Sequence, residues 1–69
     1  MKRSTKAKRL KERIEDEYLE VEHLYRILKT NIVTEAFSTS AMYKVQAMKN
    51  LKSAMDNLEE AASYVEEIV

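Results

Sequence analysis

Apolar side chains recur along the first half of the chain in alternating steps of three and four residues. From residue 5 onward this stripe contains Ala7, Leu10, Ile14, Tyr18, Val21, Tyr25, Leu28 and Ile32, with Leu24 beside it. Such steps keep apolar side chains on one face of a helix that packs against a neighbour. The residues between them are mostly Glu, Lys and Arg, which favour helix formation. The pattern predicts an amphipathic helix over about residues 5–30.

The second half of the chain carries the same alternation. Its stripe consists of Met48, Leu51, Met55, Leu58, Ala62, Val65 and Val69. A neighbouring row recurs at every seventh residue and consists of Ala47, Ala54, Ala61 and Ile68. Small residues at this spacing allow two helix backbones to approach closely, although alanine is also the strongest helix former. A second helix is predicted over about residues 40–69.

Residues 30–40 separate the two stripes and are rich in hydroxyl-bearing and β-branched side chains. These side chains are weak in helix interiors, and the hydroxyl-bearing ones are favoured at helix caps. Two positions for the turn remain open. One is a break near residues 31–34 with Thr34 as cap, and the other is a break near residues 37–40 with Ser38 or Ser40 as cap. Residues 1–6 are expected to fray ahead of the first helix.

Two long helices joined by a short link predict an all-α fold, an antiparallel helical hairpin that forms a single domain. One hairpin cannot cover two wide stripes, so we expect a homodimer in which two hairpins form a four-helix bundle. A parallel coiled coil of one continuous helix is the competing fold, because no Gly or Pro forces a break. The residues expected in the core and dimer seam are Ile14, Tyr18, Val21, Tyr25, Leu28, Met48, Leu51, Ala54, Met55, Leu58, Ala61 and Val65.

Composition narrows the chemistry that the chain can perform. Its 69 residues include no Cys, no Gly and no Pro, and one His. Disulfides, thiolate metal sites and Gly-rich phosphate loops are therefore excluded, and no cofactor or metal is expected. Small domains without such support usually rely on oligomerisation. The absence of Cys fits a cytoplasmic protein, and the short apolar runs predict no membrane span.

The charges are unevenly distributed along the chain. Residues 1–13 carry a net charge of +6 and residues 14–69 a net charge of −6. A basic segment can bind nucleic acid, and the candidate residues are Lys2, Arg3, Lys6, Lys8 and Arg9. In an antiparallel hairpin, however, residues 9–13 would lie beside the acidic residues 59–67, and the two groups of charges would largely neutralise each other.

Apolar residues outside the stripes suggest a docking surface. Leu19, His23 and Ile27 form a row at four-residue spacing on the outer side of the first helix. Glu20 and His23 have the spacing of metal ligands in di-iron bundles, but both lie off the apolar stripe and are expected in solvent. The leading hypothesis is a non-enzymatic protein–protein interaction module, an adaptor, regulator or inhibitor of a larger protein. Nucleic-acid binding is the alternative, and an enzyme is not expected.

In length and helical periodicity the chain resembles the Rop-type helical-hairpin dimers of plasmid copy control, which bind paired RNA loops. Other small bundles, such as secretion co-chaperones and phage-encoded inhibitors of host proteins, share the same features. The resemblance implies a dimer of hairpins and assigns no roles to individual residues.

Overall fold

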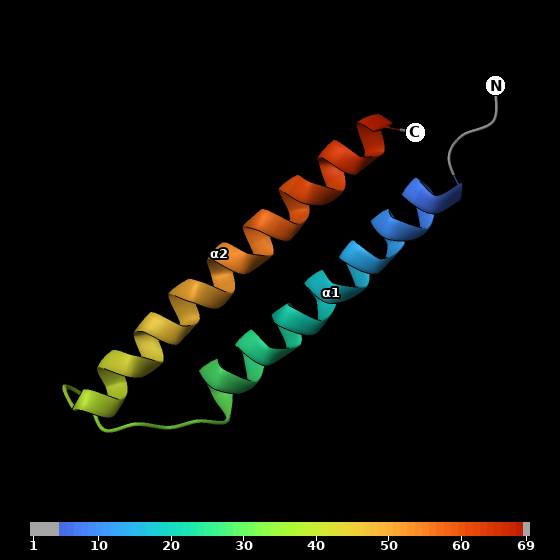
Figure 1. Cartoon of the computed structure of the whole chain (residues 1–69). Helices are drawn as coiled ribbons and strands as arrows, with labels where there is room; N and C mark the ends of the chain where they lie inside the picture. The colour runs from blue at the N-terminus through green and yellow to red at the C-terminus, as the bar shows by residue number, and fades with distance from the viewer. Residues whose placement is uncertain (1–4, 69) are drawn as a thin grey trace.

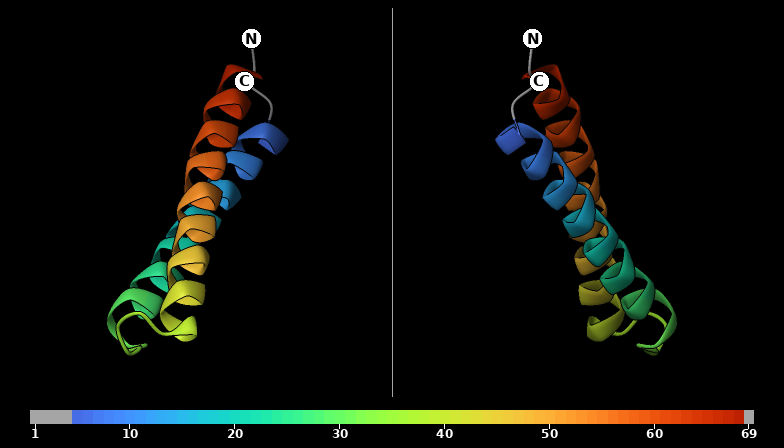
Figure 2. Two further views of the ribbon diagram at one scale, coloured as in Figure 1. Left: turned by 90° about the vertical axis from the view of Figure 1, so that its left-hand side faces the viewer. Right: turned by 90° about the vertical axis from the view of Figure 1, so that its right-hand side faces the viewer.

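The computed structural model describes residues 5–68, which form two α-helices, α1 (Thr5–Thr30) and α2 (Thr39–Ile68). The helices run antiparallel and lie side by side, joined by a linker of residues 31–38 (Figure 1). Two further views show the same pairing from its edges (Figure 2). The described residues contain no strand. The predicted all-α helical hairpin is therefore confirmed. Helix α1 already includes Thr5 and Lys6, which had been expected to fray.

The C-terminal end of α1 is held by side chains as well as by backbone. The Thr30 hydroxyl donates a hydrogen bond to the Arg26 carbonyl at 2.7 Å, and the Asn31 amide donates to the Ile27 carbonyl at 2.8 Å. The Lys44 ammonium reaches across from α2 to the Lys29 carbonyl in the last turn of α1 at 3.3 Å and to the Ile32 carbonyl in the linker at 2.6 Å. The carbonyls of a last helical turn lack partners within the helix, and a cation stabilises their partial negative charge. Lys44 thus ties the start of α2 to the end of α1.

Helix α2 begins at a serine cap. The Ser38 hydroxyl oxygen accepts a hydrogen bond from the Ala41 amide at 3.1 Å and donates one to the Glu35 carbonyl at 2.6 Å. An amide of the first turn is thereby satisfied, as in other serine-capped helices. Of the two turn positions left open by the sequence, the linker covers residues 31–34 and residues 37 and 38, whereas residues 39 and 40 already belong to α2. Of the candidate caps, Ser38 is the one that the helix uses. Phe37, immediately before the cap, adopts a left-handed conformation with φ 63°.

The two helices meet along their predicted stripes but enclose no interior. All residues of the predicted core seam are half-buried. Within the described residues, the buried side chains are Ala7 and Ala62, each 9% exposed. The Cα atoms extend over 57 × 17 × 11 Å, so the molecule is about one helix thick in its shortest dimension. Each side chain between the helices therefore keeps an open side.

Candidate interaction surfaces

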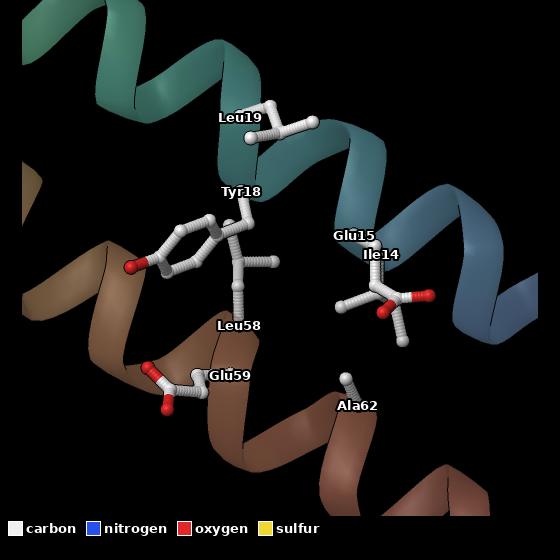
Figure 3. A pocket seen from close by; sticks show the side chains of 7 residues that line it. All are labelled: Ile14, Glu15, Tyr18, Leu19, Leu58, Glu59 and Ala62. Atoms are coloured by element: carbon white, nitrogen blue, oxygen red, sulfur yellow. The ribbon is translucent and has the colours of Figure 1, made fainter.

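One register describes the contact between the helices over most of their length. Toward the open end of the hairpin, Lys11 forms an ion pair with Glu66 at 3.3 Å. Closer to the linker, the Lys52 ammonium lies 5.9 Å from the centroid of the Tyr25 ring. Between these two points, Tyr18 and Leu58 point toward each other (Figure 3). This register determines which residues share each flank of the hairpin.

The first flank carries charges, and we call it the charged flank. Glu15 on α1 and Glu59 on α2 line the same hollow, so the seven-residue rows that contain them lie on the same side of the hairpin. These rows are Lys8, Glu15, Glu22 and Lys29 on α1, and Val45, Lys52, Glu59 and Glu66 on α2. Seven of these eight residues are charged, so this flank is suited to solvent.

A shallow hollow of about 420 Å³ lies on the charged flank. Its lining residues are Ile14, Glu15, Tyr18, Leu19, Leu58, Glu59 and Ala62. Leu19 points away from α2 in Figure 3 and is 60% exposed. The apolar floor and the two carboxylates at its edge could receive an apolar side chain that has a cationic neighbour.

The opposite flank has a different chemistry. On α2 it carries the alanine row, whose three alanines are half-buried. Tyr43, Asn50, Asn57 and Tyr64 lie beside this row and are exposed. Together they form the uncharged stripe, which consists of Ser40, Tyr43, Ala47, Asn50, Ala54, Asn57, Ala61, Tyr64 and Ile68. The exposed Leu10 and Leu24 lie on the same flank of α1. Sequence reasoning identified the alanine row but not the asparagines beside it, whose spacing of three and four residues from the alanines could have indicated them.

The outer row of α1 is at the surface, as its polar surroundings suggested. Leu19, His23 and Ile27 are all exposed. Successive steps of four residues drift about 40° around a helix, so the row slants from the charged flank toward the opposite one. A partner that contacts all three side chains would have to cross the outer face of α1 obliquely.

The linker end of the hairpin presents a further apolar surface, the apolar tip, formed by Ile32, Val33, Phe37, Met42 and Tyr43. Val33 is 88% exposed and Phe37 is 103% exposed. A non-glycine residue in the left-handed region costs about 1 kcal/mol or more, so the contacts around Phe37 must hold it there. Two sets of hydrogen bonds fix the backbone around Phe37: the Lys44 contacts before it in the chain and the Ser38 cap after it. The apolar stripes of the sequence include Ile32 but not Val33 or Phe37.

The basic segment lies partly outside the described residues. Lys2 and Arg3 are in that undescribed part, whereas Lys6, Lys8 and Arg9 are exposed on the first turns of α1. The ion pair of Lys11 with Glu66 joins the basic end of α1 to the acidic end of α2. This pair is one of those expected between residues 9–13 and residues 59–67.

The described residues hold no group of three or more His, Asp or Glu side chains placed to bind a metal ion. Neither described helix has a stretch long and apolar enough to cross a membrane. Comparison of the chain with protein families, with curated proteins and with solved structures found no match.

Proposed function

We propose that the chain is a non-enzymatic protein–protein interaction module: a homodimer of hairpins, forming a four-helix bundle, that docks on a larger protein to regulate or inhibit it. One observation carries the proposal. The described residues bury two alanines and no large side chain, while large apolar side chains are exposed on both helices and at the tip. A chain of this kind gains its hydrophobic stabilisation by association.

The exposed area supports pairing of two chains. A folded monomer of 8.1 kDa exposes about 4,500 Å² on average. The exposed area of this chain is 5948 Å². The excess of roughly 1,400 Å² is larger than the ~800 Å² that each partner contributes to an interface of standard size. Pairing of two hairpins along their length would remove an excess of this order.

The apolar tip and the outer row of α1 are the surfaces that we assign to the larger protein. Apart from Tyr43, which the apolar tip shares with the uncharged stripe of α2, these surfaces lie away from that stripe, so a dimer built along it leaves them accessible. Phe37 is a large aromatic side chain held by a structured turn, and such anchors dominate the energetics of protein interfaces. Leu19 and Ile27 would extend the contact along α1.

Nucleic-acid binding is the second candidate, and the exposure of Lys6, Lys8 and Arg9 on adjacent turns favours it. Contacts with phosphates release counterions, so binding of this kind weakens steeply as salt increases. The acidic end of α2 beside this segment opposes it, because Glu66 already pairs with Lys11.

One set of variants separates the two functions. The tagged full-length chain is used to isolate its partner from the native host, and the affinity for the identified partner is then measured. We expect Phe37→Ala, and Leu19→Ala combined with Ile27→Ala, to weaken binding at least about tenfold without loss of helicity. The matched triple change Lys2→Ala, Arg3→Ala and Lys6→Ala should leave that affinity nearly unchanged. If the wild-type chain instead binds RNA or DNA tightly at about 0.15 M salt, and the triple change abolishes this binding, the second candidate replaces the first.

A further inference from the structure

The uncharged stripe extends along the whole of α2. Its members follow one another in strict steps of three and four residues from Ser40 to Ile68. This alternation is the pattern that keeps a second helix in continuous contact. An α-helix turns about 100° per residue. The centre of the uncharged stripe therefore lies about 100° around the helix axis from the centre of the apolar stripe that faces α1. In cross-section a four-helix bundle is roughly square, so each helix contacts two neighbours in directions about a right angle apart. The uncharged stripe therefore lies where α2 would contact a second neighbour.

The order of residues along the stripe is close to a palindrome. From residue 43 to residue 64 it runs Tyr, Ala, Asn, Ala, Asn, Ala, Tyr, with Ala54 at the centre. A surface of this kind is complementary to itself when a two-fold axis passes through its centre. In such an interface residue i of one chain contacts residue j of the other, and j contacts i.

The charges of α2 have the same centre. Its cations, Lys44, Lys49 and Lys52, all precede Ala54, whereas its anions all follow Ala54: Asp56, Glu59, Glu60, Glu66 and Glu67. A parallel pair of α2 helices would place the anions of both chains side by side. An antiparallel pair places the basic half of each helix along the acidic half of the other, which is the electrostatically favourable orientation.

We propose that the uncharged stripe of α2 binds the same stripe of a second copy of this chain, antiparallel, about a two-fold axis at Ala54. This assignment rests on the proposed homodimer and identifies its interface. Ala54 meets Ala54 of the second copy, Ala47 meets Ala61, Asn50 lies opposite Asn57, and Tyr43 lies opposite Tyr64.

Each contact has a physical role in this arrangement. The alanines let the two backbones approach closely, which charged or long side chains would prevent. Each asparagine amide has both donors and an acceptor, so Asn50 and Asn57 can hydrogen-bond across the interface and disfavour other registers. The tyrosines cover the two ends of the alanine contact with their rings while their hydroxyls reach water. The two apolar tips then lie at opposite ends of the dimer, where both remain accessible.

Cysteine cross-linking tests the interface directly, because the full-length chain has no Cys of its own. Three single variants are made, Ala54→Cys, Ala47→Cys and Ala61→Cys, together with the control Ser53→Cys on the exposed outer face next to the stripe. Under mild oxidation we expect most of Ala54→Cys to form a disulfide-linked dimer. Ala47→Cys and Ala61→Cys should each stay largely unlinked alone and should link to each other when mixed. Two copies of residue 47 would lie about 21 Å apart, fourteen residues along the helix, which is beyond the reach of a disulfide.

The contrary results are equally distinct. Linking of Ala47→Cys to itself would show a parallel pair and overturn the proposal, and so would linking of Ser53→Cys as extensive as that of Ala54→Cys. Sedimentation equilibrium of the wild-type chain separates this failure from that of the proposed function. A dimer without linking at any stripe position overturns this interface and leaves the homodimer intact, whereas a folded monomer at micromolar concentration overturns both.

Discussion

Alanine occupies the two buried positions of the described residues, Ala7 and Ala62. A single methyl group lies close to the backbone, so one neighbouring helix is enough to cover it. Larger side chains of the same stripe, such as Leu51 and Leu58, extend beyond the contact and remain half-exposed. Their full burial therefore requires a further helix. The stability that these side chains contribute should come largely from association with another chain.

A carboxylate at one of these positions should unfold the chain. Leu58→Asp removes apolar contacts and places a charge between the helices, so we expect the free energy of unfolding to fall by about 3 kcal/mol or more. Leu19→Asp makes the same chemical change at an exposed position and should lower the free energy of unfolding by no more than about 0.5 kcal/mol. Thermal melts followed by circular dichroism compare the two. Equal losses would mean that Leu58 is not part of the packed seam.

The residues of the seam could be predicted from the sequence because their spacing repeats, and a repeat is visible without knowing the fold. Lys44 and Phe37 could not be predicted in the same way. Lys44 looks like an ordinary solvated helix residue, and its contact with the Ile32 carbonyl depends on the path of the linker. Phe37 is fully exposed and has a left-handed backbone, and no local pattern of apolar residues encodes either feature.

Among the elements, the link between α1 and α2 was the least predictable part. Hydroxyl-bearing residues occur at several positions there, and each is a plausible cap. The structure uses Ser38, and the linker covers the first region that the sequence left open and the beginning of the second. The charge separation within α2, in contrast, is fully visible in the sequence. Its link to dimer formation emerges only when the charges are compared with the proposed two-fold axis at Ala54.

The tie between α2 and the end of α1 should be measurable by removing one ammonium group. Lys44→Met keeps most of the side-chain length but loses the contacts with the Lys29 and Ile32 carbonyls, at 3.3 and 2.6 Å. Because the site is exposed to solvent, we expect a loss of about 1 kcal/mol and faster amide exchange in the last turn of α1. Lys49→Met, five residues further along α2, is the matched control. It should change neither the free energy of unfolding nor the amide exchange. Unchanged exchange in Lys44→Met would show that backbone hydrogen bonds alone hold this turn.

At the scale of the whole molecule, the thickness of the hairpin decides how its stability should behave. A body one helix thick has no side chain surrounded on all sides, so its folding and its association should occur together. In obligate homodimers the apparent stability depends on the concentration of the chain. A hairpin that folds alone would lack this dependence.

Thermal melting at several concentrations therefore tests whether the folded unit is a dimer or a single hairpin. For a dimer of two 69-residue chains, each tenfold increase in concentration adds about 1.4 kcal/mol to the apparent free energy of unfolding. This increase corresponds to a rise in melting temperature of about 5 °C. Between 1 and 100 µM we expect a total rise on the order of 10 °C for the wild-type chain. The oxidised Ala54→Cys protein is the matched control. Its two chains are already linked, so its melting temperature should be higher and should not change with concentration. A wild-type melting temperature that is constant over the same range would mean that the two helices are stable by themselves, and their open faces would then be free to bind other proteins as a monomer.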